Sequence, residues 1–161
     1  QSAIHMTRRA LRWRQDVSIL CVDTWLGSSE HWLRREWRDR LRLVNGYPSL
    51  YHHFLANVAR AGLDRHFVPL PMTSRDAAAV LREIDLQADL IYLDAGHDEA
   101  SVREDIANYW PFVRPGGAMF GDDYEKIWPG VVTAVDDFLG RATDIAVSGI
   151  DGSKWVAQKA F

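Results

Sequence analysis

The sequence predicts an α/β fold, built from a mostly parallel sheet with helices on both faces. Two observations favour this class. Short apolar runs rich in Val, Ile and Leu alternate with longer segments of helical period, and this alternation is typical of buried parallel strands joined by helices. The chain has 161 residues, enough for one domain with one core. We therefore expect residues 1–161 to form a single domain.

The composition is that of an ordinary globular protein. Hydrophobic residues make up 47% and the net charge is −3, which gives no indication of nucleic-acid binding. The single cysteine, Cys21, lies in an apolar run and has no partner for an internal disulfide, as is usual in a reducing cytosol. No apolar stretch approaches the roughly 18 residues of a membrane span, and no secretory signal follows Arg8 and Arg9. The sequence predicts a cytoplasmic protein without membrane association.

The first half of the chain begins within a helix and contains two expected strands. Ser49 is suited to cap one helix, and Gly62 to end it in left-handed geometry. Another amphipathic helix is predicted by apolar residues at helical spacing, namely Leu33, Trp37, Leu41 and Val44. The elements expected here are helices over 1–14, 30–44 and 49–60 and strands over 17–23 and 66–72.

The second half of the chain also alternates expected helices and strands, but it ends in two consecutive strands. Ser74 is suited to cap a helix, and the two glycines of "RPGG" permit a turn with positive φ before a strand. The tail after residue 144 resembles two strands joined in a hairpin through "IDGS", so the last strand is expected to be antiparallel. The other expected elements are helices over 74–84, 99–113 and 131–139 and strands over 89–95 and 118–123.

Three of the expected strands end in acidic residues. Asp23 ends one strand, Asp94 a second, and Asp122 with Asp123 a third. Ligands of open parallel sheets bind beyond the carboxyl ends of the strands, although an isolated carboxylate there is as often a helix cap. The strands ending in Asp94 and Asp122 are separated by one helix, so a right-handed crossover would place them about 4.8 Å apart.

Carboxylates this close repel one another unless a cation lies between them, and Mg²⁺ prefers carboxylate oxygens. Asp94, Asp122 and Asp123 therefore make a candidate magnesium site. Adjacent residues of a regular strand face opposite ways. Both Asp122 and Asp123 can bind one ion only if the chain turns at or after Gly121.

His97 follows Asp94 by three residues on the same loop. A lone histidine at such a position is usually a surface residue near a helix start. Beside three acids, an imidazole that titrates near neutral pH is suited to accept a proton from a bound ligand. We therefore interpret His97 as a candidate general base.

With these residues in view, the chain resembles the class I S-adenosylmethionine-dependent methyltransferases. Within them it is most similar to the branch of macrolide-sugar O-methyltransferases and cephalosporin-hydroxylase-like proteins. The resemblance lies in "ILCVDTWLGS", "DLIYLDAGHDEASVREDI", "YWPFVRPGGAMFGDDY" and "WPGVVTAVDDF". It implies a Rossmann-like, doubly wound, mostly parallel sheet with an antiparallel C-terminal strand.

The resemblance also implies a role for each motif residue. Asp23 would accept hydrogen bonds from the ribose of the cofactor, with Thr24 and Trp25 continuing that wall. Met72, Thr73 and Ser74 would flank the adenine. Asp94, Asp122 and Asp123 would bind Mg²⁺, and His97 would remove the proton of an acceptor hydroxyl as the sulfonium methyl is transferred to it. The expected acceptor is a small molecule of sugar or natural-product type.

The chain departs from this family at its beginning. The family has a first strand ending in an acidic, glycine-rich loop around the methionine part of the cofactor, and "QSAIHMT" resembles the helix after that loop. In the family, that strand lies between the strands ending here at Asp23 and Asp94. We expect the sequence to be an N-terminally truncated fragment; the alternative is an inactive cofactor-binding domain.

Other interpretations of the sequence are weaker. The segment "HWLRREWRDRLRLV" could form an RNA-binding helix through Arg34, Arg35 and Arg38. Its acidic residues and apolar spacing favour instead a cover over the active site or a subunit contact in a homo-oligomer. A receiver-like signalling domain also gathers acids and Mg²⁺ at a sheet edge, but in the reverse chain order.

Overall fold

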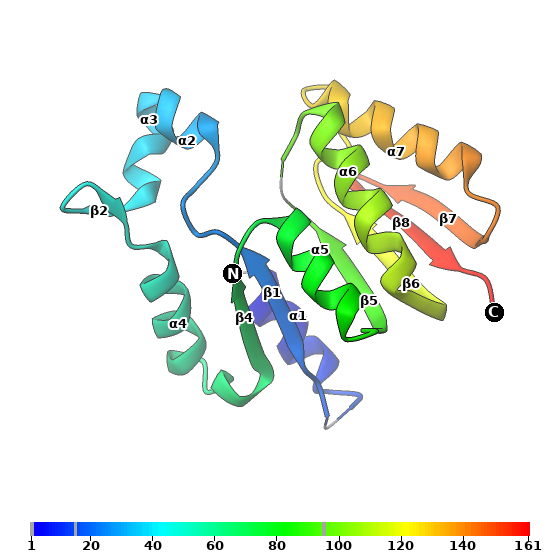
Figure 1. Cartoon of the computed structure of the whole chain (residues 1–161), viewed down its shortest axis with the longest axis horizontal. Coiled ribbons are helices and arrows are strands. Elements are labelled where there is room, and N and C mark those ends of the chain that lie inside the picture. Colours follow the sequence, from blue (N-terminus) through cyan, green and yellow to red (C-terminus); the bar gives the residue numbers. More distant parts are fainter. Residues whose placement is uncertain (1, 15, 95) are drawn as a thin grey trace. The chain divides into compact units, whose positions relative to one another are not determined.

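The computed structural model describes residues 2–14, 16–94 and 96–161 (Figure 1). The chain divides into two compact units, residues 1–77 and 78–161, and each is described by itself. The expectation of one domain over 1–161 stays a prediction. None of the helices in the described part of the chain combines the length and the apolar character needed to cross a membrane.

The first unit contains a two-stranded parallel sheet. Strand β1 (Ile19–Asp23) pairs with β4 (Phe67–Pro71), with Asp23 opposite Pro71 at the carboxyl end. The two prolines of β4 leave it a short strand, as expected from their missing N–H groups. The helices of this unit are α1 (Ser2–Ala10), α2 (Ser29–Leu33), α3 (Arg35–Arg38) and α4 (Leu50–Arg60), with 3₁₀ turns η1 (Asp39–Leu41) and η2 (Asp64–His66).

The core of the first unit lies between the sheet and two helices. Val58, Leu63 and Phe67 are buried together, and apolar residues of α1, β1 and α4 pack against them, namely Ala3, Ile4, Ile19, Cys21 and Phe54. The aromatic rings of Phe54 and Phe67 meet edge to face, with centroids 5.9 Å apart. Burial of Cys21 raises the pKa of its thiol to about 11, as expected of a packed rather than a reactive cysteine.

The prediction of one amphipathic helix over 30–44 is wrong. The helix is interrupted at Arg34, whose backbone is extended, and the chain leaves helical geometry at Arg42, with φ of 49°. Strands β2 (Leu43–Val44) and β3 (Tyr47–Pro48) then form a short antiparallel hairpin. Leu41 is fully buried but Leu33 is 84% exposed, so tertiary burial of one leucine overrides the helical period.

Two predicted helix caps also differ. Thr73, not Ser74, caps α5 (Ser74–Glu83), because its hydroxyl oxygen accepts the Asp76 N–H at 3.1 Å. Ser49 precedes α4, but its hydroxyl donates to the Arg42 carbonyl at 2.6 Å. The left-handed geometry predicted for Gly62 is confirmed, with φ of 68°.

The second unit contains a four-stranded sheet in the order β5-β6-β8-β7 (Figure 1). Its strands are β5 (Ala88–Leu93), β6 (Val113–Gly121), β7 (Ile145–Asp151) and β8 (Lys154–Lys159). Pairing of β5 with β6 is parallel, whereas β8 is antiparallel to both of its neighbours. The predicted α/β class with an antiparallel C-terminal strand is confirmed.

Helices α6 (Glu99–Tyr109) and α7 (Pro129–Arg141) lie side by side over this sheet (Figure 1). Met119, Trp155 and Ala157 face them, and each is at most 2% exposed. Val131 and Val135 of α7 are buried as well, and the rings of Phe138 and Trp155 meet edge to face at 6.2 Å. This burial fixes β6, which ends next to Asp122, and β8, which begins at Lys154.

The "RPGG" segment is part of β6 rather than a turn before it. Val113 pairs with Ala88 and Ala118 with Leu90, so the register shifts across the segment. Gly116 takes φ of 73° and allows the extra residues to bulge from the strand. A 3₁₀ turn, η3 (Trp110–Phe112), separates α6 from β6.

The two sheets are separate among the strands that the structure describes. β1 pairs with β4, and β5 pairs with β6. The family's first strand, expected between β1 and β5, is thus represented by no strand of the described residues.

Two glycines of α7 predict opposite effects of the same substitution. A methyl group on Gly130 would lie 2.5 Å from the backbone nitrogen of Glu99 and 2.8 Å from the His97 carbonyl, whereas one on Gly140 meets open space. We expect Gly130→Ala to lower the free energy of unfolding by about 1–3 kcal/mol and Gly140→Ala to raise it by about 0.5–1 kcal/mol. Urea denaturation of both variants measures this, and equal effects would contradict the close packing of Gly130.

Candidate active site

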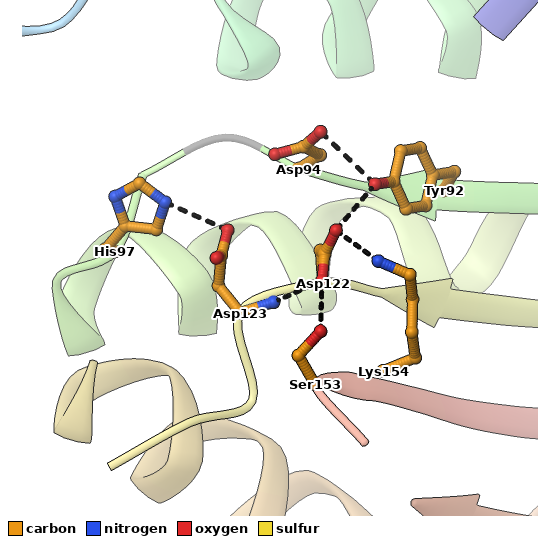
Figure 2. Close-up of polar contacts among 7 residues, drawn as sticks. All are labelled: Tyr92, Asp94, His97, Asp122, Asp123, Ser153 and Lys154. Carbon is orange, nitrogen blue, oxygen red and sulfur yellow. Dashed lines mark hydrogen bonds and ion pairs between the residues drawn. The ribbon is translucent and has the colours of Figure 1, made fainter. Parts of the chain in front are cut away.

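The carboxyl ends of β5 and β6 bring two acids together. Leu93 pairs with Gly121, so Asp94 and Asp122 follow at adjacent strand ends. The Tyr92 hydroxyl lies between them, 3.2 Å from Asp94 Oδ2 and 3.3 Å from Asp122 Oδ2 (Figure 2). Burial and these nearby carboxylates raise the pKa of Tyr92, which keeps it a proton donor. The predicted proximity of Asp94 and Asp122 is thus present.

Asp122 is the most heavily hydrogen-bonded member of this cluster. Its Oδ1 accepts from the Ser153 hydroxyl and from the Asp123 N–H, each at 2.9 Å. Its Oδ2 accepts from Tyr92 and forms an ion pair with Lys154 Nζ (Figure 2). Partial burial alone would raise the pKa of Asp122, but the bonds from Lys154, Asp123 N–H and Ser153 outweigh it and lower the pKa to about 2.

The chain turns sharply directly after Asp122. Asp123 has φ of 61°, a left-handed geometry that an aspartate tolerates better than most residues. The turn carries the Asp123 carboxylate away from that of Asp122, and its Oδ2 lies 3.1 Å from His97 Nε2 (Figure 2). The condition set from the sequence, a turn at or after Gly121, is met.

His97 is held by contacts on two sides. Its ring stacks on Trp128, with centroids 4.0 Å apart and planes 19° apart, and its Nε2 faces Asp123. The loop that carries it is fixed by Asp98, whose side chain accepts the Ser101 N–H at 3.0 Å and caps α6. This hydrogen bonding lowers the pKa of Asp98. The imidazole is therefore positioned beside the acids rather than directed into solvent.

A small cavity lies within this arrangement. Its volume is about 20 Å³, which suits a single water or ion. Asp94, His97, Asp122 and Asp123 line it together with apolar residues and the buried Asp105. A wider hollow of about 310 Å³ lies beside Lys154, and its lining is mostly apolar, including Phe120, Ile150 and Val156.

The first group of predicted cofactor residues lies at the end of β1. Asp23 Oδ1 accepts the Trp25 N–H at 2.8 Å, and Thr24 Oγ1 accepts the Leu26 N–H at 3.2 Å. Trp25 has φ of 54° and is 7% exposed, because its indole packs on Tyr51 and Phe54 at 4.9 and 5.1 Å. Asp23 is exposed at the sheet edge, whereas the indole of Trp25 belongs to the core.

The second group, Met72, Thr73 and Ser74, follows β4. Since β1 and β4 are parallel and end together at Asp23 and Pro71, these residues share a sheet edge with Asp23. The Met72 N–H donates to the Leu70 carbonyl at 2.9 Å. The hydroxyl of Thr73 also donates to the Asp76 carboxylate at 2.7 Å, so Thr73 is engaged in fixing the start of α5.

Sequence reasoning missed Tyr92, Trp128, Ser153 and Lys154. Tyr92 could have been found, because it precedes Asp94 by two residues and so shares its face of the strand. Ser153 and Lys154 reach Asp122 only through the antiparallel register that places Trp155 opposite Gly121, and no local pattern reports that register.

The three acids have the chemistry of a magnesium site but not yet its arrangement. Carboxylate oxygens are suitable ligands for Mg²⁺, and those of Asp94 and Asp122 share Tyr92 as a neighbour. Within residues 2–14, 16–94 and 96–161, however, no three His, Cys, Asp or Glu side chains are grouped to hold one ion. Asp122 contacts Lys154 and Asp123 contacts His97 instead.

Comparison with known families identifies the class of protein. The Methyltransferase domain family matches residues 2–124, which is most of the chain. The chain belongs to this methyltransferase family, and the predicted recognition is confirmed. The receiver-like alternative is therefore set aside. A search of curated protein sequences found no significant match.

Solved structures of O-methyltransferases share this fold. The O-methyltransferase from Bacillus cereus, in complex with SAH, matches with a TM-score of 0.62 and 14% identity over 99% of this chain and 81% of that one. NovP, an O-methyltransferase, matches with a TM-score of 0.67 and 21% identity, over 95% of this chain and 64% of that one. MycE, a methyltransferase from the mycinamycin biosynthetic pathway in complex with Mg, SAH and mycinamycin VI, matches with a TM-score of 0.53 and 19% identity, over 97% of this chain and 48% of that one. This chain therefore spans about half the length of MycE.

The lowered pKa of Asp122 predicts that the stability of the fold decreases in acid. Its folded pKa of about 2 lies below its ordinary value of 3.8, so its ionisation stabilises the fold above about pH 4, and this contribution is lost as the pH falls toward 2. We expect Asp122→Asn to lose less stability than the wild type between about pH 4 and 2. Thermal unfolding across this range, with exposed Asp64→Asn as control, tests it. Parallel wild-type and Asp122→Asn curves would contradict the assignment.

Proposed function

We propose that this protein is an S-adenosylmethionine-dependent O-methyltransferase acting on a hydroxyl of a small molecule of sugar or natural-product type. The observation that carries the proposal is the position of His97, bonded to Asp123 and adjacent to the acids that end β5 and β6. Membership of the methyltransferase family and the likeness to an O-methyltransferase in complex with SAH support it.

The proposed cofactor residues are those at the edge of the first unit's sheet. Asp23 is exposed, and its Oδ2 is proposed to accept from the ribose hydroxyls while Oδ1 holds the turn to Trp25. Thr24 and the backbone of Trp25 would continue this wall. Met72, Thr73 and Ser74 would flank the adenine from the end of β4.

The proposed reaction is a direct displacement. The acceptor oxygen forms a bond to the sulfonium methyl, the bond from that carbon to sulfur breaks, and the hydroxyl proton passes to Nδ1 of His97, because Nε2 faces Asp123. Asp123 stabilises the imidazolium, because their 3.1 Å contact becomes an ion pair once His97 is protonated. Trp128 keeps the ring in place through stacking, so the base does not have to be ordered during the reaction.

Magnesium dependence is proposed on the donor chemistry of Asp94, Asp122 and Asp123. When bound, the ion would lower the pKa of an acceptor hydroxyl. Tyr92 and Ser153 hold the Asp122 carboxylate in a fixed orientation at the strand end. Cytoplasmic localisation and a homo-oligomer contact through residues 30–44 stay predictions.

Substitution of His97 should affect methyl transfer but not cofactor binding. In methyl transfer from S-adenosylmethionine to a panel of hydroxylated small molecules, we expect His97→Asn to lower kcat by about 10²- to 10⁴-fold. Its affinity for S-adenosylhomocysteine, measured by calorimetry, should be unchanged, because His97 is proposed to contact the acceptor proton only. Exposed His52→Asn serves as the matched control.

Two results would contradict the proposal. Full activity of His97→Asn would remove the general base. Absence of S-adenosylhomocysteine binding by the wild type would contradict the proposed cofactor, whereas binding without transfer to any hydroxyl would favour the alternative of an inactive cofactor-binding domain.

A further inference from the structure

Lys154 is a cation built into the acidic cluster. It is the first residue of β8, and the pairing of Trp155 with Gly121 places it beside Asp122, the residue after Gly121. Its Nζ forms an ion pair with Asp122 Oδ2 (Figure 2). Lys154 also lines the hollow bounded by Phe120 and Val156. Thus one of the three carboxylates already has a positive partner from the chain itself.

The donors around Asp122 differ in how firmly they are held. A carboxylate has about four acceptor positions, and Asp122 receives Tyr92 and Lys154 on one oxygen and Ser153 and the Asp123 N–H on the other. The Asp123 N–H belongs to the turn itself. Ser153 is tied to that turn, since its carbonyl accepts the Tyr124 N–H at 2.9 Å.

Lys154 is the partner that can leave most easily. Its side chain is 51% exposed, compared with 25% for Asp122. It consists of four flexible methylene groups and a terminal ammonium group that is well hydrated in solution. An exposed ion pair of this kind contributes little net free energy. Departure of Lys154 would open one acceptor position on Oδ2 and leave the bonds to Oδ1 intact.

We propose that the ammonium of Lys154 and a divalent cation are alternative occupants of Asp122. Lys154 neutralises the carboxylate when no metal ion is present and is displaced when one binds. The remaining charges favour the exchange, because Asp94, Asp105 and Asp123 also line the cavity beside Asp122. The inference rests on the proposed function in taking Asp122 as a metal ligand and Mg²⁺ as the ion.

The test is a calorimetric titration with MgCl₂ in the absence of cofactor and acceptor. Lys154→Met keeps the length of the side chain and removes its charge, so we expect Mg²⁺ to bind at least about fivefold more tightly than to the wild type. Lys154→Arg keeps the charge and should bind within about twofold of the wild type. Lys126→Met removes a charge from an exposed lysine of the neighbouring loop and should also bind as the wild type does.

The role of Asp122 as a metal ligand is tested by Asp122→Asn, which should abolish the heat of Mg²⁺ binding. Circular dichroism establishes that each variant is folded. Mg²⁺ affinity of Lys154→Met equal to or below that of the wild type would overturn the proposal, and so would the absence of Mg²⁺ binding to both the wild type and Lys154→Met. Since cofactor binding and methyl transfer are not read in this titration, failure here leaves the proposed methyltransferase activity to its own test.

Discussion

The parallel pairing of β5 with β6 imposes the central constraint on this protein. It places the carboxylates of Asp94 and Asp122 at adjacent strand ends, where two negative charges repel each other. The structure compensates with donors from distant parts of the chain. Tyr92 lies between the two acids, and the β7–β8 hairpin contributes Ser153 and Lys154. The antiparallel ending of the sheet thus has a chemical role as well as a structural one.

The same strand end explains how a histidine is held beside the acids. Because Asp123 turns in left-handed geometry, consecutive aspartates serve different neighbours: Asp122 faces the hairpin and Asp123 faces His97. Gly130 allows the start of α7 to lie against the backbone that carries His97, and Trp128 stacks on the imidazole. The imidazole is therefore fixed by packing as well as by its carboxylate, which is the preorganisation that the proposed proton transfer would require.

The parts of this account that the sequence could predict are those governed by local pattern. The apolar run before Asp94 and the glycine before Asp122 predict strand ends, and chain order predicts that they are neighbours. The segment 30–44 could not be predicted in this way, because burial of Leu41 depends on a tertiary contact that outweighs helical period. Lys154 was missed for a related reason, since its approach to Asp122 depends on the register between β6 and β8.

The proposal on which the rest depends is that Asp94, Asp122 and Asp123 bind one divalent cation beside His97. A crystal structure of the protein with MnCl₂, with the ion located by its anomalous scattering, tests this most directly. We expect one manganese ion coordinated by Asp94, Asp122 and Asp123, with Lys154 turned away from Asp122 and His97 still beside the three acids. An intact Asp122–Lys154 ion pair at saturating manganese, with the metal bound elsewhere, would contradict it.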